Sequence, residues 1–365
     1  MNFIKGAIML IKRILSVLLL ISLLLSLLSC DIKLLRVPNE NGGEENGSEQ
    51  GEKIEPKNRV FYEYFDTVSV IYDYSGSKNE DFSALCTEIG ELLHRYHRLY
   101  DIYNEYEGMT NIATLNRMAG KGPVKVSEEI IDLLSFSIEM HRKTGGAVNV
   151  AMGAVLSLWH ELRERGERIP TAAELSERGA HISIENLVVD AENSTVEILD
   201  PRASIDVGAV AKGFVAERLY EFFVSRGLFG YAISLGGNLR TVGTKPSGEG
   251  WVSGIKSPSG DGYIRTLEIA DSSLVTSGSY ERFYDVDGVR YHHIIDPVSL
   301  MPKNYYHSLS VYTRDSAVAD ALSTALFNME GERIEAVLEN FPDVEVTVLT
   351  ADGQMRIYGS RASKT

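Results

Sequence analysis

Apolar and polar residues alternate over residues 59–74, "RVFYEYFDTVSVIYDY", which is the pattern of a half-buried strand or hairpin. The next stretch has a helical period instead, and its apolar positions are Phe82, Leu85, Ile89, Leu92, Leu93, Tyr96 and Leu99. Helices are also predicted over residues 126–146 and 315–329. Residues 203–227 indicate a strand, a turn and a helix in succession.

Several later segments are typical of β-hairpins. The apolar runs "LVVD" and "TVEIL" flank "AENS", and residues 282–296 have a turn signal at Asp287-Gly288. Residues 344–359 form a last predicted hairpin, and no repeat of fixed period occurs. The pattern therefore predicts an α+β fold, in which antiparallel sheets pack against helices.

Residues 1–29 have the features of a secretory signal. Lys5, Lys12 and Arg13 precede an apolar run from residue 14 to residue 28, which is shorter than the roughly 20 residues of a spanning helix. The ending "LLSC" resembles the bacterial lipobox, in which the Cys, here Cys30, is lipidated. An uncleaved signal anchor is the alternative, and both place the remaining chain outside the cytoplasm.

The composition of the remaining chain predicts a tether, a folded body and a short tail. Residues 30–58 are acidic, Gly-rich and nearly without apolar side chains, which predicts a disordered tether. The folded body is expected over residues 59–358, followed by a tail over 359–365. A net charge of -15 makes nucleic acid an improbable partner. If Cys30 is acylated, Cys86 has no intramolecular partner, and its place on an apolar helix face predicts burial.

Two stretches combine groups suited to a phosphate and a hard cation. In "DVGAVAKG", residues 206–213, glycines allow close backbone approach and Lys212 supplies a cation, although such strand-to-helix turns are common. In "DALST", Asp320 and Thr324 are four residues apart and share one helix face. Their oxygens suit Mg²⁺. An ordinary helix turn is the alternative.

Two further stretches bring polar groups together. "SLGGNLR", residues 234–240, allows either a close ligand or a tight turn. "VTSGSYERF" and "YHHIIDP" stand on the two arms of one predicted hairpin, as a metal or acid–base site or as an exposed polar ladder. Their polar residues are Ser277, Ser279, Tyr280, Arg282, His292, His293 and Asp296.

The types and order of these motifs closely resemble the FAD:protein FMN transferase family, the ApbE-type periplasmic flavin transferases with a T-fold-like architecture. The resemblance runs from Phe65 to the helix that carries Thr324 and includes "AMGAVLSLW" at residues 151–159. It implies an enzyme that cleaves FAD with Mg²⁺, attaches FMN by a phosphoester bond to a Thr or Ser of exported flavoproteins, and releases AMP.

The resemblance also implies roles for single residues. The backbone carbonyl of Ala209 and the side chains of Asp320 and Thr324 match the family's metal ligands. FAD is expected at Phe65, Tyr103, Asp206, Lys212, Ser277, Tyr280 and Arg282. Tyr103 stands where some relatives have Trp. "FDT" at Phe65 replaces the "MGT" common elsewhere.

The expected catalytic residues are His293 and its partner Asp296, and His292 is expected to face the other way along the strand. His293 would accept the proton of the attacking hydroxyl or donate a hydrogen bond to the phosphate. Two alternatives use the same residues: FAD hydrolysis to FMN and AMP, and a non-catalytic FAD-binding lipoprotein. The expected location is the periplasmic or outer face of the bacterial inner membrane, with Cys30 as the anchor.

Overall fold

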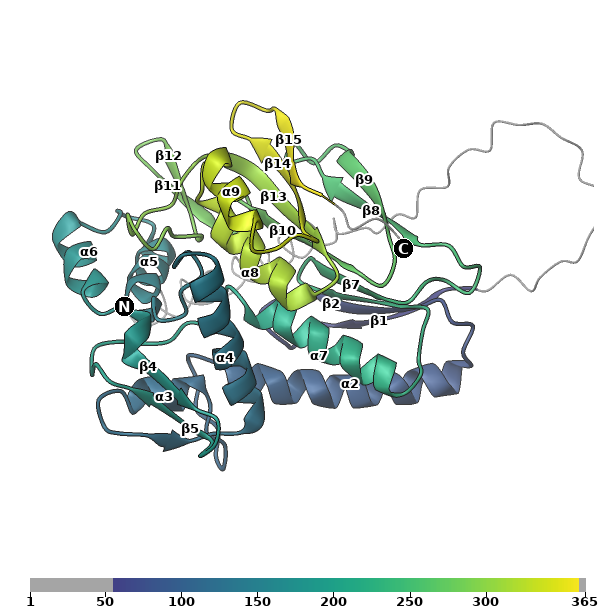
Figure 1. The fold of residues 1–365 in the computed structure, drawn as a ribbon, viewed down its shortest axis with the longest axis horizontal. Coiled ribbons are helices and arrows are strands. Elements are labelled where there is room, and N and C mark those ends of the chain that lie inside the picture. The colour runs from purple at the N-terminus through teal and green to yellow at the C-terminus, as the bar shows by residue number, and fades with distance from the viewer. Residues whose placement is uncertain (1–54, 361–365) are drawn as a thin grey trace, which may run out of the picture. The chain divides into compact units, whose positions relative to one another are not determined.

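The computed structural model describes residues 55–360 (Figure 1). The predicted signal 1–29, Cys30 and most of the predicted tether lie outside the described residues, as do residues 361–365. The first strand begins at Lys57 and the last ends at Gly359, close to the expected limits of the folded body. Among the described helices, none is long and apolar enough to cross a membrane.

The largest sheet has eight strands in the order β1-β2-β6-β7-β10-β13-β14-β15, and every neighbouring pair is antiparallel. Its strands are β1 (Lys57–Phe61), β2 (Ser69–Asp73), β6 (Tyr231–Leu235), β7 (Asn238–Val242), β10 (Ser273–Gly278), β13 (Tyr306–Thr313), β14 (Glu345–Thr350) and β15 (Met355–Gly359). The predicted α+β class with antiparallel sheets is therefore confirmed.

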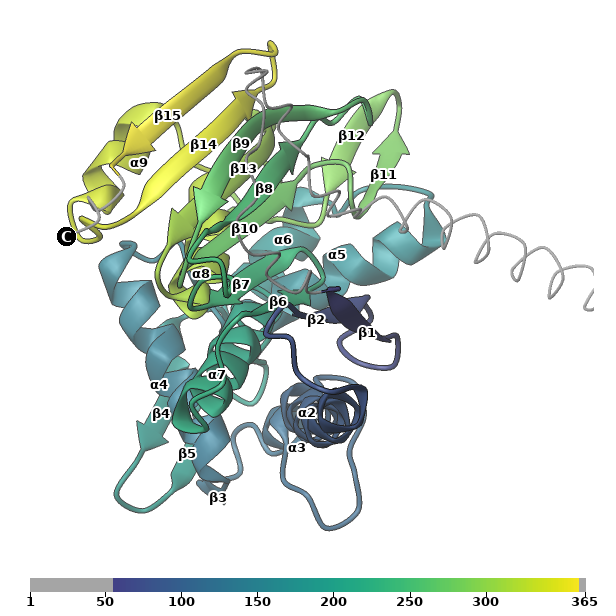
Figure 2. The same cartoon turned by 90° about the vertical axis from the view of Figure 1, so that its right-hand side faces the viewer.

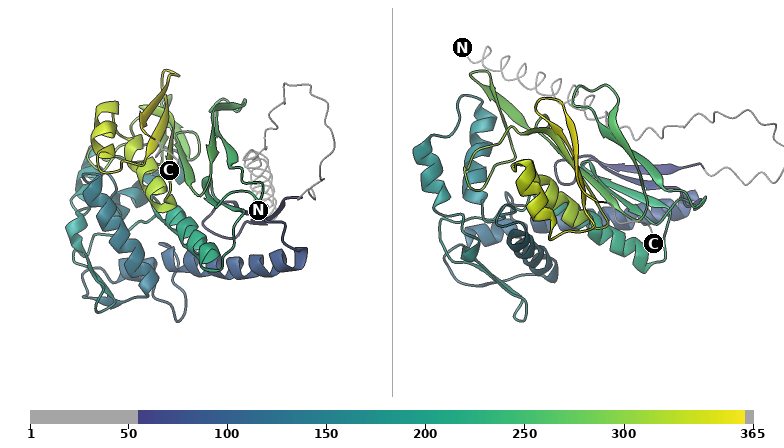
Figure 3. Two further views of the ribbon diagram at one scale, coloured as in Figure 1. Left: turned by 45° about the vertical axis from the view of Figure 1, so that its right-hand side comes forward. Right: turned by 45° about the horizontal axis from the view of Figure 1, so that its top comes forward.

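Three small sheets surround the large one. They are β3-β5-β4, made of β3 (Val124–Lys125), β4 (Leu187–Asp190) and β5 (Thr195–Ile198); β8 (Trp251–Lys256) with β9 (Tyr263–Ile269); and β11 (Phe283–Val286) with β12 (Val289–His292). The β8–β9 hairpin reaches the large sheet through Arg265, whose guanidinium lies 2.9 Å from the Glu345 carboxylate. Its green ribbon stands apart from the yellow helices in the left view of Figure 3.

The helices cover mainly one face of the large sheet. They are α2 (Asn79–Tyr100), α3 (Ile112–Arg117), α4 (Glu128–Lys143), α5 (Gly153–Arg165), α6 (Ala172–Gly179), α7 (Ala211–Ser225), α8 (Ser316–Phe327) and α9 (Gly331–Leu338), with a 3-10 turn at Ile184–Asn186. Helix α7 packs on β6 and β7, while α8 packs on β10 and β13, and the two helices contact each other (Figure 2).

Two separate apolar clusters hold these layers together. The main one fills the space between the large sheet and its helices, where Leu309 and Val311 of β13 are fully buried. Complete burial of a side chain of this size contributes about 1.5–3 kcal/mol. A second cluster joins α5 and α6 to the β11–β12 hairpin, through Trp159, Leu175 and Tyr284 among others. We call this unit of α5, α6 and the hairpin the lateral lobe.

The two tight turns follow from their sequences. Gly236 and Gly237 have φ values of 57° and 91° and connect β6 to β7 directly, with Leu235 paired to Asn238. "SLGGNLR" is thus a tight hairpin turn. Asp287 and Gly288 have φ values of 51° and 77° and connect β11 to β12 in the same way. Positive φ at both central positions is what a two-residue hairpin turn requires.

Candidate functional site

The strand-like segment before α7 places Asp206. The Met152–Gly153 segment pairs with Ser204, and the Asp206 N–H donates to the Val150 carbonyl at 2.8 Å. The Asp206 Oδ1 accepts from the Gly208 N–H at 2.8 Å, which closes the turn that leads to Ala209 and Lys212. Burial raises the pKa of the Asp206 carboxyl, and the hydrogen bond from the Gly208 N–H offsets only part of this rise.

The start of α7 lies against the middle of α8. The Gly213 N–H donates to the Asp320 Oδ2 at 2.7 Å, and the Lys212 Nζ lies 4.0 Å from the same oxygen. A side chain at Gly213 would place its Cβ 2.3 Å from the Asp320 Cβ and from the Ser316 carbonyl oxygen. Glycine is therefore required at this helix contact. Asp320 is only 4% exposed, and this burial raises its pKa, while Lys212 lowers it.

The oxygen donors around Asp320 fit a hard cation. Thr324 is half-buried one helical turn after Asp320, and Ala209 is half-buried two residues before α7. Only one carboxylate belongs to this expected set. Accordingly, no group of three or more His, Cys, Asp or Glu arranged for a metal occurs within residues 55–360. A carboxylate, a hydroxyl and a carbonyl are ligands that Mg²⁺ accepts while it keeps waters and substrate phosphate.

Polar groups of two neighbouring strands line the same helix. The Ser277 Oγ of β10 lies 2.9 Å from the Ser323 Oγ, and Ser323 also donates to the Asp320 carbonyl at 2.9 Å. Asn238, at the start of β7, is close enough to Asp320 to lower its pKa. Tyr280 folds back over the end of β10, where a Cβ at Gly278 would lie 2.7 Å from its ring.

The turn between β1 and β2 is strained at the position expected to contact FAD. Phe65 and Asp66 have φ values of 58° and 49°, a region that costs energy for residues other than Gly, although Asp tolerates it. The Phe65 N–H donates to the His97 Nδ1 at 3.2 Å, and the two rings meet edge to face at 5.6 Å. The Asp66 carbonyl lies 3.5 Å from the Arg282 Nη2.

Tyr103 is an exposed aromatic residue beside this turn. Its side chain is 65% exposed, and its ring lies 5.8 Å from that of His160 on α5. Desolvation raises the pKa of the Tyr103 hydroxyl, as do the nearby Asp206 and Asp66 carboxylates. Tyr103 and Asp206, which the sequence assigns to the same substrate, are therefore close enough to interact, and we call the region between them and Asp320 the cleft.

The two histidines of the hairpin face opposite ways, as expected. The His292 Nε2 lies 2.9 Å from the Lys303 carbonyl, its Nδ1 accepts from the Ile294 N–H, and its ring packs edge-on against Phe327. The His293 N–H donates to the Arg282 carbonyl at 3.0 Å, which extends the hairpin ladder by one pair.

The electrostatic surroundings keep His293 neutral. Desolvation lowers its pKa to about 3, with further contributions from Arg282, His292, Lys212 and Arg163. Three of these groups carry a permanent positive charge. They converge on His293 in a chain whose net charge is -15.

The structure does not bring Asp296 to His293. The Asp296 Oδ2 accepts from the Ser299 N–H at 3.0 Å and from its hydroxyl at 2.7 Å, and the Lys303 Nζ lies 3.9 Å away. No hydrogen bond or ion pair joins the two side chains within the described residues. The proline after Asp296 turns the chain, so this carboxylate closes the turn instead of orienting the imidazole.

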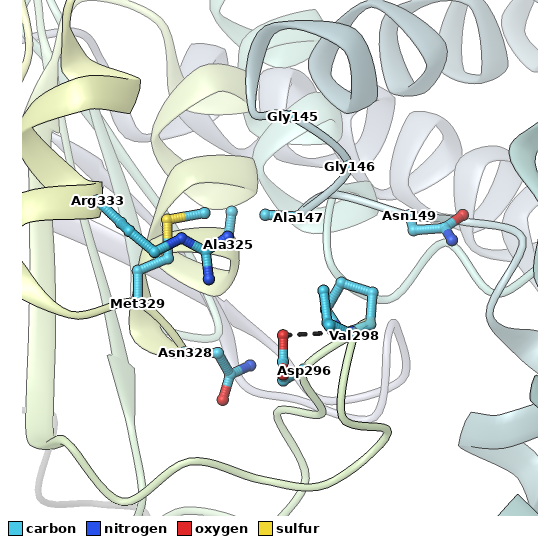
Figure 4. Close-up of a pocket in the computed structure, with 11 residues that line it drawn as sticks. Gly145, Gly146, Ala147, Asn149, Asp296, Val298, Ala325, Asn328, Met329 and Arg333 are labelled. Atoms are coloured by element: carbon cyan, nitrogen blue, oxygen red, sulfur yellow. Dashed lines mark hydrogen bonds between the residues drawn. The ribbon is translucent and has the colours of Figure 1, made fainter.

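Asp296 lines a separate cavity of about 180 Å³ (Figure 4). The cavity lies at the C-terminal end of α8 on the face that also carries Thr324, because Asn328 follows Thr324 by four residues. Its lining consists of Gly145, Gly146, Ala147, Asn149, Asp296, Pro297, Val298, Ala325, Asn328, Met329 and Arg333. The Asn328 Oδ1 accepts from the Lys303 N–H at 3.1 Å.

Sequence reasoning missed three residues of the cleft. His160 and Arg163 project from α5 and are joined by a 2.7 Å contact between the His160 Nδ1 and the Arg163 Nη2. Glu281 is the third, and burial raises its pKa while Lys212 and Arg282 lower it. The spacing of His160 and Arg163 could have identified them in the sequence, because they follow the buried Trp159 by one and four residues.

An antiparallel α+β fold that places oxygen donors beside basic side chains suits a phosphorylated ligand. Comparison with known sequences makes this specific, because residues 67–348 match the ApbE family. A Treponema pallidum FAD:protein FMN transferase is 35% identical over 67% of this chain and 72% of its own length. A Klebsiella pneumoniae protein of the same name is 32% identical over 73% of this chain and 82% of its own. The chain belongs to the ApbE family.

Solved structures of ApbE proteins also superpose on this chain. The Thermotoga maritima ApbE protein superposes with a TM-score of 0.74 at 27% identity, covering 83% of this chain and 97% of the other. The flavin transferase ApbE of Vibrio cholerae has a TM-score of 0.71 at 28% identity, covering 84% and 97%. The family resemblance seen in the sequence is thus confirmed.

Proposed function

We propose that this chain is a Mg²⁺-dependent FAD:protein FMN transferase. It would cleave the diphosphate of FAD, join the FMN phosphate to a Thr or Ser hydroxyl of an exported flavoprotein, and release AMP. The observation that carries the proposal is the buried Asp320 carboxylate, held by the Gly213 N–H beside Lys212, in a member of the ApbE family.

Asp320, Thr324 and the Ala209 carbonyl would hold the Mg²⁺. A bound Mg²⁺ would neutralise charge on the diphosphate oxygens and polarise the phosphorus under attack. Lys212 approaches the Asp320 carboxylate from the cleft side and supplies a second positive charge to the same region.

The two arms of FAD would extend in opposite directions from the diphosphate. The cavity of about 180 Å³ beside Asn328 holds a purine more easily than the three-ring flavin. Its glycine backbone and the Asn328 amide suit the polar edge of adenine. The exposed ring of Tyr103 would offer the flavin a stacking surface, and Phe65 would add a second ring, because the adjacent Asp66 is close enough to raise the pKa of the Tyr103 hydroxyl.

His293 would receive the proton of the attacking hydroxyl. It is neutral in the free protein because its pKa is lowered to about 3, so its ring is available as an acceptor. Binding of the anionic diphosphate would offset the surrounding cations and raise this pKa toward the ordinary value, which strengthens the base. The new P–O bond forms to the acceptor oxygen as the P–O bond to AMP breaks.

The setting of the reaction follows from the N-terminal segment. Residues 1–29 would direct export, and a lipidated Cys30 would tether the enzyme to the periplasmic or outer face of the inner membrane, where its acceptor flavoproteins reside. Radiolabelled palmitate should enter the wild-type chain and be absent from Cys30→Ala. Incorporation into that variant would overturn the anchor.

The proposal is tested by mass. The full chain in detergent is incubated with FAD, Mg²⁺ and a candidate acceptor domain, and the acceptor should gain the mass of one phosphoester-linked FMN, with none gained in EDTA. Asp320→Asn should abolish the gain, whereas Asp343→Asn on the exposed surface should not. Free FMN and AMP with an unmodified acceptor would indicate hydrolysis, and intact bound FAD would indicate storage.

A further inference from the structure

Arg163 and Arg282 lie close together at the mouth of the cleft without a carboxylate partner. Arg163 is half-buried on α5, and Arg282 is at the base of the β11–β12 hairpin. Within residues 55–360, neither has a carboxylate within ion-pair distance. The described contacts of their guanidiniums are neutral: the His160 ring for Arg163 and the Asp66 carbonyl for Arg282.

Other arginines on the same surfaces are paired. Arg165, two residues further along α5, lies 2.5 Å from Glu161, and Arg290 of the hairpin lies 3.4 Å from Asp285. The difference follows from placement, since Arg163 lies one helical turn after Trp159, whose ring packs against Tyr284, and Arg282 precedes Tyr284 by two residues on the hairpin. Burial lowers the pKa of Arg163, and the nearby Arg282 guanidinium lowers it further. Two neighbouring cations without a carboxylate at ion-pair distance, one of them half-buried, favour an anionic ligand.

The neighbouring residues orient this pair. The Nδ1 of His160 holds the Arg163 Nη2 at 2.7 Å, and the His160 ring lies against Tyr103. The Arg282 backbone carbonyl accepts from the His293 N–H at 3.0 Å, which places the residue beside His293, and its Nη2 lies 3.5 Å from the Asp66 carbonyl. His160 thus orients the Arg163 guanidinium, while the hairpin places Arg282 between Asp66 and His293.

We propose that Arg163 and Arg282 form an anion subsite that binds the non-bridging oxygens of a diphosphate, with His160 as the residue that positions Arg163. The inference deepens the proposed function, on which the identity of the diphosphate as that of FAD rests. Guanidinium forks match phosphate oxygens in pairs, which an ammonium does not. The subsite would hold the diphosphate from the side opposite Asp320.

The test uses inorganic pyrophosphate as the probe and the full chain in detergent with EDTA, so that no metal contributes. Calorimetric titration should give measurable binding to the wild type. Arg163→Ala and Arg282→Ala should each weaken binding about tenfold or more, because each removes a charge-assisted contact. Arg163→Lys should retain part of the affinity. Arg165→Ala, on the same helix and 61% exposed, should bind as the wild type does.

A far-ultraviolet melt of each variant checks that it is folded, and Arg163→Lys remains informative if Arg163→Ala is not. Wild-type pyrophosphate affinity in Arg163→Ala and Arg163→Lys, or no binding to the wild type in EDTA, would overturn the subsite even if FMN transfer proceeds. The expected binding pattern without any transfer would instead overturn the proposed function and keep the subsite.

The same variants distinguish a second source of anionic oxygens. If Arg163→Ala leaves the pyrophosphate and FAD dissociation constants unchanged and raises only the KM for the acceptor protein, the two guanidiniums bind a carboxylate of the acceptor. That result would overturn the diphosphate assignment. An increase of the FAD dissociation constant with an unchanged acceptor KM would support it.

Discussion

Gly213 sets the distance between the two helices of the cation position. Its N–H bonds the Asp320 carboxylate, and its missing side chain lets α7 approach the α8 backbone. The spacing of Asp320 and Thr324 is readable from the sequence, because an interval of four residues always shares a helix face. The contact with Gly213 joins residues 107 apart and is not readable in that way.

Gly213→Ala is expected to lower the free energy of unfolding by about 1–3 kcal/mol, the usual range for overpacking. The added methyl would overlap the Ser316 carbonyl, which belongs to the backbone and does not rotate away. Urea denaturation provides the measurement. Gly90→Ala is the control, since this helical glycine has only a Phe61 ring atom 3.3 Å from the added Cβ. Equal stability of both variants would refute the helix-contact argument.

His293 should make the protein less stable in acid. Its folded-state pKa of about 3 lies below the unfolded value of about 6.5. Above pH 6.5 the neutral His293 ring does not lower the free energy of unfolding. As the pH falls from 6.5 toward 3, the free energy of unfolding decreases, because the unfolded chain binds the proton more tightly. The stability lost between pH 7 and pH 5 should be smaller in His293→Gln than in the wild type. An identical loss in denaturation experiments would contradict the neutral, desolvated imidazole.

At the scale of elements, the hairpins were predictable and the lateral lobe was not. Asp287-Gly288 specifies its turn through two neighbouring residues, so a local pattern suffices. The position of His160 and Arg163 depends on α5 packing against the distant hairpin through Trp159, Tyr284 and Tyr291. Asp296 illustrates the opposite error, since its closeness to His293 in sequence suggested a pair, whereas its carboxylate bonds Ser299 in the turn that follows.

Trp159 connects α5 to the start of the "YHHIIDP" segment and to the turn that follows it. Its ring stacks on Tyr291 at 6.0 Å, and its Nε1 donates to the Leu300 carbonyl at 2.9 Å. Trp159→Phe keeps an aromatic ring but removes the donor, so kcat for FMN transfer should fall several-fold as His293 becomes less well held, while the FAD dissociation constant changes little. Stopped-flow transfer and equilibrium FAD titration measure the two quantities.

The matched control for Trp159→Phe is Trp251→Phe, in the β8–β9 hairpin away from the lobe, where the ring packs against Tyr74. This substitution should leave kcat at the wild-type value. A fall of kcat in the Trp251 variant equal to that in the Trp159 variant would attribute the effect to general loss of stability rather than to positioning.

At the scale of the whole molecule, the cleft draws on segments spread over most of the chain. Phe65 follows β1, Asp206 precedes α7, and Thr324 lies on α8 near the end of the described residues. The order of motifs could be matched to a family from the sequence alone. The place of Arg163 in the cation-rich wall could not, because Arg163 and Arg282 are separated by more than a hundred residues and carry no shared local pattern.

Mg²⁺ and FAD should stabilise the fold together more than separately, because each binds only the native state and the two share a site. The Tm of the full chain with both ligands should exceed the sum of the two single increments, and Asp320→Asn should remove the excess. Calorimetric melts measure this. Strictly additive increments in the wild type would show that the metal and the diphosphate occupy independent positions.

The lateral lobe has its own apolar cluster, separate from that of the large sheet. Segments with an independent core open as cooperative units, at a lower free energy than global unfolding. The amide hydrogens of α5 and β12 should thus exchange with solvent at a common rate, ahead of those in β13. Each such opening would carry Arg163, Arg282 and His293 away from Asp320 at once, so the enzyme would lose its substrate-facing wall while the sheet stays folded.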